Sequence, residues 1–317
     1  SRGLGDVYKR QEEHSVLQQK DNNAPAAGHL HLQRGQKSLQ DHLCHLRFSI
    51  CAGRNRCGVS VGGFRRHCGI LRHGAHGLFE SSNALLNKFV ENTVWNAKNN
   101  HANLPTDCPT RERHGWTGDA QIFFNTAAYL FDYASFAQKY MRDVYDWQKK
   151  DGKLPQIAPY GGVDFYMSFM DGSVGWADAG VLIPYRFWKL YGDDSLIRRH
   201  YGGMVRYARF MIKRCTQFTP LRHHLPLKGE AKKYIVNYGH SYGEWAEPAD
   251  VFPDDWKNIV LPHPEESTPY TVFIMEHMME IAGYLGKQQD KALFEKYRDG
   301  CTKAYRELVT LPGYTLD

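Results

Sequence analysis

The chain has 317 residues, 42% of them hydrophobic, and a formal net charge of +6 at pH 7. It is long enough for one large hydrophobic core, and no apolar run is long enough to span a bilayer, which excludes a membrane-spanning protein. Residues 1 to 78 hold 12 Lys or Arg against 5 Asp or Glu, whereas residues 79 to 317 hold 28 against 29. The positive charge therefore belongs to the first quarter of the chain alone.

Residues 1 to 78 lack the pattern of a folded domain. They contain no Trp and keep no apolar period of 2 or 3.6 residues. A basic nucleic-acid arm and a metal-binding module are two ordinary interpretations, both weak. The four cysteines of this part form no Cys-x-x-Cys pair of the kind that zinc modules favour; they are Cys44, Cys51, Cys57 and Cys68. A third interpretation fits better, because Ser1 to Gln11 resembles translated adapter sequence and the residues after it resemble an out-of-frame translation. We expect little structure in residues 1 to 78.

The rest of the chain carries helical patterns separated by loops that contain Gly and Pro. Apolar residues at helical spacing predict seven helices, namely Asn83 to Lys98, Asp119 to Phe131, Ser135 to Lys149, Asp178 to Leu190, Asp194 to Lys213, Ser267 to Leu285 and Gln289 to Leu308. Asp119 is expected to cap the second helix, and Ser267 and Thr268 the sixth, with Pro269 in its first turn. The fourth is apolar almost all round and should be buried. We predict an all-α chain built of successive hairpins.

The segment from Asp107 to Asp119 is the most informative part of the chain. It reads Asp-Cys-Pro-Thr-Arg-Glu-Arg-His-Gly-Trp-Thr-Gly-Asp. Pro and Gly interrupt any helical repeat, so the sequence predicts a loop that leads into a helix. The loop brings three carboxylates, those of Asp107, Glu112 and Asp119, together with the indole of Trp116. Glycosidases use such groups, because one carboxyl protonates the leaving oxygen, others bind hydroxyl groups, and an indole stacks on the sugar ring.

Each of these residues also has an ordinary structural interpretation. Asp119 at the start of a helical run is also typical of a helix cap with no other role, and Glu112 between two arginines resembles a surface ion pair, which contributes little. A lone Trp is usually part of a core. The flanking Pro, Gly and Trp residues favour the functional interpretation, because isolated charge pairs do not come with them. The cysteines after residue 78 have no spacing that indicates a metal site or a disulfide, and we expect them to be reduced or buried; they are Cys108, Cys215 and Cys301.

The segment Pro105 to Gln121 resembles the core motif of the bacterial α-L-rhamnosidases of glycoside hydrolase family 78. Phe79 to Asn83, leading into Val94 to Asn96, is similar to the first barrel helix of that family. Gly175-Trp176-Ala177-Asp178-Ala179 and Tyr242-Gly243-Glu244-Trp245 fall where the family has loops that contact the sugar. The resemblance covers roughly residues 79 to 317. One departure is small, since many members have an Asp before the Glu where this chain has Arg111.

The resemblance implies an incomplete (α/α)6 toroid of the six-hairpin glycosidase type in residues 79 to 317, with C-terminal helices missing. It also implies inverting hydrolysis of terminal α-L-rhamnosyl residues from plant or bacterial glycosides and polysaccharides. Glu112 is the expected general acid. The expected substrate-binding residues are Asp107, Arg111, Trp116, Asp119, Trp176, Asp178, Glu244 and Trp245. The family's general base lies beyond the stretch that corresponds to Asp317, so the isolated chain is expected to be inactive or nearly so.

Further expectations follow from the resemblance. The partner is a rhamnose-containing oligosaccharide or glycoside, with no nucleic acid, membrane, metal or cofactor, and the usual location is periplasmic or extracellular. Glu112 and Trp116 should converge with Trp176 on one cleft. Arg111 and Arg113 should not both point at Glu112, because a general acid must hold a proton. Two alternatives stay open: another glycosidase or lyase on the same toroid, because fold does not fix chemistry, and a non-catalytic carbohydrate-binding chain.

Overall fold

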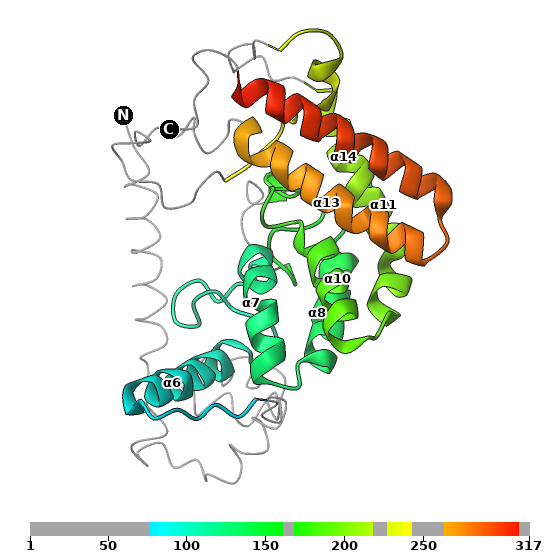
Figure 1. Cartoon of the computed structure of the whole chain (residues 1–317). Helices are drawn as coiled ribbons and strands as arrows, with labels where there is room; N and C mark the ends of the chain where they lie inside the picture. Colours follow the sequence, from blue (N-terminus) through cyan, green and yellow to red (C-terminus); the bar gives the residue numbers. More distant parts are fainter. Residues whose placement is uncertain (1–76, 161–167, 218–226, 243–262, 311–317) are drawn as a thin grey trace, which may run out of the picture. The chain divides into compact units, whose positions relative to one another are not determined.

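The computed structural model describes residues 77–160, 168–217, 227–242 and 263–310. These residues form seven α-helices and one short 3₁₀ helix and contain no strand, so the all-α prediction is confirmed for them (Figure 1). The chain divides into two compact units, Ser1–Phe136 and Ala137–Asp317. The lack of structure predicted for residues 1 to 78 falls almost entirely outside the described residues, and the division after residue 78 stays a prediction.

From residue 77 onwards, where the first unit is described, it contains two complete helices, α6 (Ala84–Asn100) and α7 (Thr117–Leu130). Asn83 caps α6, because its side-chain oxygen accepts from the backbone N–H groups of Leu85 and Leu86; the sequence pattern left this cap open between Ser82 and Asn83. The predicted cap at Asp119 is wrong. Helix α7 begins two residues earlier, since the Trp116 carbonyl already accepts from the N–H of Ala120.

The second unit is a set of packed helices, reached through α8 (Ala134–Asp146), in which the boundary between the units falls. Its members are α10 (Ala179–Tyr191), α11 (Ser195–Cys215), the 3₁₀ helix η2 (Gly229–Tyr234), α13 (Pro264–Tyr284) and α14 (Gln288–Val309). Helices α13 and α14 form an antiparallel hairpin (Figure 1), α10 packs against both α11 and α13, and η2 packs on α14. Every residue of α10 from Ala179 to Pro184 is buried, as predicted for this helix.

The start of α13 differs from the prediction. The helix begins at Pro264 instead of Ser267, and Pro269 lies inside it. Pro264 suits the first helical position, and the acidic side chains that follow it favour a helix N-terminus. The hydroxyl of Thr268 does not cap the helix, because it accepts a hydrogen bond from the buried backbone N–H of Val236 at 3.1 Å. The Thr268 side chain therefore makes a tertiary hydrogen bond instead of the helix cap that the sequence predicted.

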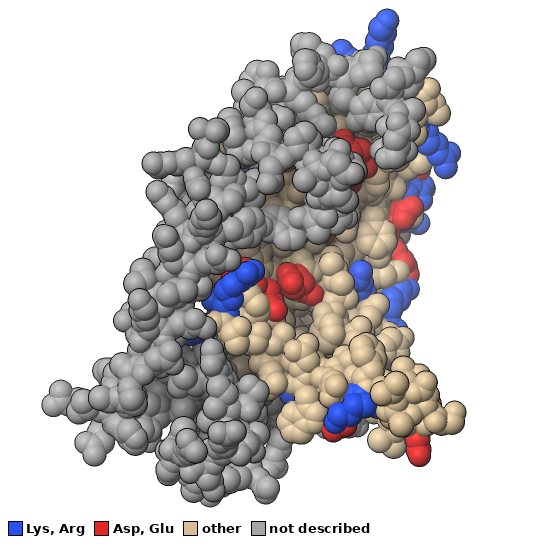
Figure 2. All heavy atoms as spheres, turned by 90° about the vertical axis from the view of Figure 1, so that its left-hand side faces the viewer, with Lys and Arg blue, Asp and Glu red and all other residues tan. Residues whose placement is uncertain are grey.

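The surface of the described residues shows no dominant charge on the face drawn in Figure 2, where acidic and basic side chains lie beside one another. This mixture agrees with the nearly equal numbers of acidic and basic residues after residue 78. No helix in the described part of the chain combines the length and the hydrophobicity that a membrane crossing requires.

Candidate active site

The motif loop connects α6 to α7 and is fixed at its beginning. His101 follows α6 directly, is buried, and its Nδ1 lies 2.7 Å from the carbonyl oxygen of Ala97. Its ring also contacts the aromatic ring of Phe136, with 5.4 Å between the centroids. The backbone N–H and the hydroxyl of Thr106 both donate to the carbonyl of Asn100, at 2.8 and 2.9 Å. The loop therefore leaves the helix in one defined direction.

A tight turn then reverses the chain. The N–H of Asp107 donates to the carbonyl of His114, and the N–H of Arg113 donates to the carbonyl of Cys108. Arg113 has a φ of 62°, which places a residue with a side chain in the left-handed region. Such strain persists only where the surroundings enforce it, and it is frequent at functional sites. The reversal brings Asp107 back beside the residues that precede α7.

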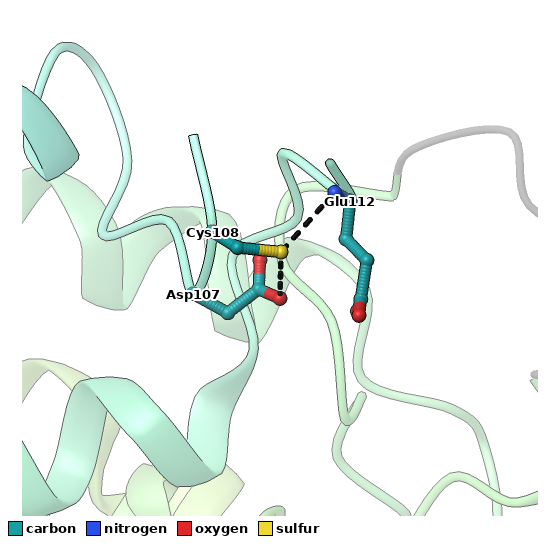
Figure 3. Close-up of side chains that lie close together, drawn as sticks. All are labelled: Asp107, Cys108 and Glu112. Atoms are coloured by element: carbon teal, nitrogen blue, oxygen red, sulfur yellow. Dashed lines mark hydrogen bonds between the residues drawn. The ribbon is translucent and has the colours of Figure 1, made fainter. Parts of the chain in front are cut away.

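Cys108 links two of the predicted site residues (Figure 3). Its thiol donates to Asp107 Oδ2 over 2.9 Å, and its sulfur accepts from the backbone N–H of Glu112 over 3.2 Å. Burial, together with the hydrogen bond to Asp107, raises the pKa of Cys108 to about 11. The thiol is therefore protonated at neutral pH and can serve as the donor. Apart from the position of Cys108 in the motif, no sequence pattern indicates this role.

The Glu112 carboxyl is held by two donors. The indole Nε1 of Trp116 donates to Oε2 over 2.8 Å, and the Arg111 guanidinium donates to Oε1 over 3.2 Å. The Arg111 side chain is 54% exposed and that of Glu112 is 25% exposed. Exposed ion pairs contribute little, so Arg111 is easily displaced, whereas the indole contact is shorter and comes from the start of a helix. The predicted acid and the predicted stacking ring thus form one pair.

The two arginines of the motif differ in their contact with Glu112. Among the described residues only Arg111 forms an ion pair with it, and Arg113 pairs with neither Asp107 nor Asp119, so the expectation that one arginine turns towards those two carboxylates stays a prediction. Arg113 Nε is buried and makes no hydrogen bond within the described residues, and the same is true of Asp107 Oδ1. A buried carboxylate oxygen without a donor costs free energy, which a donor supplied by a ligand would recover.

Asp119 lies on the first turn of α7 with an exposed side chain. The surrounding protein nevertheless removes part of the hydration of its carboxylate, and the negative charge of Glu112 lies nearby. Both effects raise the pKa of Asp119, although its own backbone N–H opposes them. The raised pKa makes Asp119 a second carboxyl group in this loop that can carry a proton.

The second unit holds the remaining predicted residues that the structure describes. Trp176 is partly buried and its ring lies 4.4 Å from that of Tyr242, between centroids. Asp178 is completely buried, and its two oxygens accept from Gly175 N at 2.6 Å and from the Tyr207 hydroxyl at 2.7 Å. Desolvation raises the pKa of Asp178 to about 6, against the opposing effect of these donors and of Arg214.

Substrate contact by Trp176 and Asp178 stays a prediction, as does their convergence with the motif loop, which belongs to the other unit. The Asp178 carboxylate already has two protein donors, so in this structure it orders its own loop. Glu244 and Trp245 lie outside the described residues.

Arg214 is an organising residue that the sequence analysis missed. It is 1% exposed and donates to the backbone carbonyls of Gly172, Tyr238 and His240, at 3.2, 2.7 and 3.0 Å. It thereby ties the loop before Trp176 to the segment that contains Tyr238 and His240. Its position three residues after the buried Met211 on α11 was an available signal, because that spacing continues the buried face of the helix.

The motif loop also offers a spacing that a metal ion could bridge. Ligand atoms of Asp107, Cys108 and Glu112 lie within 4.8 Å of one another. A thiol with a raised pKa is a poor ligand at neutral pH, because the thiolate is the binding form. The chemistry of these three groups therefore fits a hydrogen-bonded carboxyl site better than a metal centre.

Comparison with known proteins accounts for this loop and for the helices around it. Residues 75–311 match the family model of the bacterial alpha-L-rhamnosidase 6 hairpin glycosidase domain. The chain belongs to this family. An alpha-L-rhamnosidase of Streptomyces avermitilis is 31% identical over 178 residues, which are 56% of this chain and 15% of that protein. One of Formosa agariphila is 28% identical over 244 residues, or 76% of this chain and 24% of that protein.

Solved structures of rhamnosidases share the fold. The alpha-L-rhamnosidase from Dictyoglumus thermophilum matches with a TM-score of 0.58 and 30% identity, over 76% of this chain and 25% of that one. The Streptomyces avermitilis enzyme, in complex with L-rhamnose, matches with a TM-score of 0.59 and 27% identity, over 74% of this chain and 20% of that one. These matches confirm the six-hairpin glycosidase fold class. The chain spans less than a quarter of the length of the first two curated relatives that it matches.

Proposed function

We propose that this chain carries the proton-donating part of an α-L-rhamnosidase active site, and that the complete enzyme hydrolyses terminal α-L-rhamnosyl residues with inversion. The observation that carries the proposal is the 2.8 Å hydrogen bond between the Trp116 indole and the Glu112 carboxyl, within a loop that the family match includes. This bond places a ring that can stack on a sugar beside a group that can protonate the sugar's leaving oxygen. The family match favours this activity over another toroid glycosidase and over a non-catalytic binding chain.

Glu112 is the general acid in this proposal. The substrate displaces the exposed Arg111 from Glu112 Oε1, and the carboxyl then donates its proton to the glycosidic oxygen as the bond to the sugar breaks. Trp116 keeps its hydrogen bond to Glu112 Oε2 and fixes the orientation of the carboxyl. The positive charge that develops on the ring is stabilised by the carboxylates of Asp107 and Asp119.

Asp107 binds a sugar hydroxyl. Its Oδ2 is occupied by the Cys108 thiol, whereas its Oδ1 has no donor within the described residues. A hydroxyl group is the donor that a sugar supplies. The second carboxylate of an inverting pair, which activates water roughly 6.5–9.5 Å from the acid, is not assigned to any described residue.

The test uses a gene that encodes an enzyme of the full family length, with the 317-residue chain assayed beside it. Glu112→Gln removes the proton and keeps the size of the side chain. A flavonoid rhamnoside, which has a poor leaving group, should lose kcat by on the order of 10²–10⁴-fold, and an activated nitrophenyl rhamnoside should lose less. Asp107→Asn should reduce both rates alike, because it acts on the sugar that both substrates share.

Glu91→Gln is the matched control, because Glu91 is an exposed glutamate that pairs only with Lys88 on α6. It should change neither rate. Equal losses on both substrates for Glu112→Gln would reassign the acid, and Asp119 would take the role if Asp119→Asn then showed the dependence on leaving group. A complete enzyme that cleaves other glycosides and not α-L-rhamnosides would refute the proposed function.

A further inference from the structure

The second unit contains a cavity that the motif loop does not line. It has a volume of about 490 Å³ and follows the end of α8. Its wall includes two aromatic side chains and four polar ones, which are those of Trp147, Tyr160, Lys149, Gln156, Ser168 and Asp171. We call it the Trp147 pocket. Its volume falls within the range of roughly 300–1,000 Å³ that small-molecule sites occupy.

The aromatic part of the pocket faces solvent. Trp147 is 48% exposed and Tyr160 is 41% exposed, although both are large apolar side chains. Their ring centroids lie 4.9 Å apart and their planes are tilted by 38°, so the two rings pack against each other and each keeps an exposed outer face. Trp147 directly follows the last residue of α8, Asp146, whose helix fixes its position. Exposed paired rings of this kind are suited to stacking on the C–H face of a sugar.

The polar part of the pocket is ordered without any ligand. Asp171 Oδ2 forms an ion pair with the Lys149 ammonium group at 2.9 Å, and Asp171 Oδ1 accepts a hydrogen bond from the backbone N–H of Gln156 at 3.2 Å. The Lys149 ammonium also donates to the carbonyl of Ser168. Groups that are already held in place lose little conformational freedom when they bind a ligand.

The charges of the pocket favour a neutral ligand. Lys149 and Asp171 neutralise each other, and Asp146 adds one negative charge at the wall. An anionic ligand would meet the Asp146 carboxylate, and an apolar ligand would remove water from the ion pair without adding a hydrogen bond to it. A ligand with an apolar face and several hydroxyl groups satisfies both parts of the wall.

We propose that the Trp147 pocket, which no residue of the Glu112 loop lines, binds a pyranose unit of a glycan. The choice of a rhamnose-containing glycan as ligand rests on the proposed function. The existence of the site does not, because it follows from the rings, the ion pair and the volume of the pocket. Bound there, one sugar unit adds a contact between the glycan and the second unit.

The experiment follows the indole N–H signals of the 317-residue chain by NMR during titration with rutinose, a disaccharide of rhamnose and glucose. The signal that disappears in Trp147→Phe identifies Trp147. We expect this signal to shift with saturation in the wild-type chain, and Trp147→Ala and Tyr160→Ala each to weaken binding about tenfold, as loss of one aromatic contact predicts. Trp147→Phe keeps a ring and should keep most of the affinity.

Trp95→Ala is the matched control, since Trp95 is 52% exposed and does not line the pocket. It should leave the affinity unchanged. The proposal is overturned if the Trp147 signal does not move, if Trp147→Ala binds as well as the wild type, or if a sugar-free flavonoid binds as tightly as rutinose. Circular dichroism of each variant separates loss of binding from loss of folding.

Glu112→Gln separates this inference from the proposed function. That variant should bind rutinose at the pocket as the wild-type chain does. If the complete enzyme fails to cleave rhamnosides while the Trp147 signal still saturates, the proposed function fails and the carbohydrate site stands. If cleavage is normal while the signal never moves, the site fails alone.

Discussion

Asp178 makes the stability of the second unit dependent on pH. Its ordinary pKa of 3.8 is raised to about 6 in the folded protein, chiefly because the carboxylate is desolvated. Folding therefore favours the protonated form. The stability that this preference provides is complete below about pH 4 and is lost as the pH rises through about 6. A shift of about two pKa units corresponds to roughly 3 kcal/mol.

The assay is urea unfolding of the wild-type chain and of Asp178→Asn between pH 4 and pH 7.5. Asparagine cannot ionise, so the variant lacks the pH dependence that Asp178 causes. Between pH 4 and pH 7.5 the unfolding free energy of the wild type should therefore fall by roughly 3 kcal/mol relative to that of Asp178→Asn. The loss of one acceptor for Gly175 or Tyr207 adds a constant offset and does not change the slope. Asp299→Asn, which removes an exposed carboxylate on α14, controls for the change of one charge.

A difference that stays constant, or that moves in favour of the wild type as the pH rises, would refute this reasoning. In that case the buried carboxylate would be ionised throughout, and the positive charge of Arg214 would outweigh desolvation.

Three further outcomes are expected. Gly239→Ala should lower the unfolding free energy by about 1–3 kcal/mol, because Gly239 has a φ of 84° and an added Cβ would lie 2.9 Å from Arg214 Nε; urea unfolding measures this. Arg214→Met should cost about 1.5–3 kcal/mol or more, since three backbone carbonyls lose a charged donor, and a loss below 1 kcal/mol would contradict the account of the loops. Cys215 and Cys301 are fully buried, with 3.9 Å between their sulfur atoms, so a thiol reagent should modify them only on unfolding, as mass spectrometry would show.

The sequence located the helices well because their apolar stripes are long. Helix α14 was predicted within one residue at each end, and α10 was recognised as buried from its composition. Helix starts were less predictable where tertiary contacts decide them. Thr268 resembled a cap but bonds to another segment, and Trp116 begins α7 through its carbonyl, which any residue possesses.

The motif predicted which groups belong to the candidate site but not how they are held. That Glu112 and Trp116 bond directly, and that Cys108 bridges Asp107 and Glu112, depends on the reversal at Arg113, whose positive φ no sequence rule for arginine indicates. The Trp147 pocket could not be predicted from the sequence either. Trp147 was assigned to the end of a helix, and only the end of α8 at Asp146 places it in the cavity wall.

The three carbonyl contacts of Arg214 have a consequence for engineering the enzyme. A designer who grafts the segment around Trp176 from another family member, to change what the enzyme accepts, would also move the carbonyl of Gly172 that this arginine holds. The segment that contains Tyr238 and His240 would then be pulled out of place, because Arg214 holds it as well. Chimeras should therefore exchange both segments and the end of α11 as one cassette.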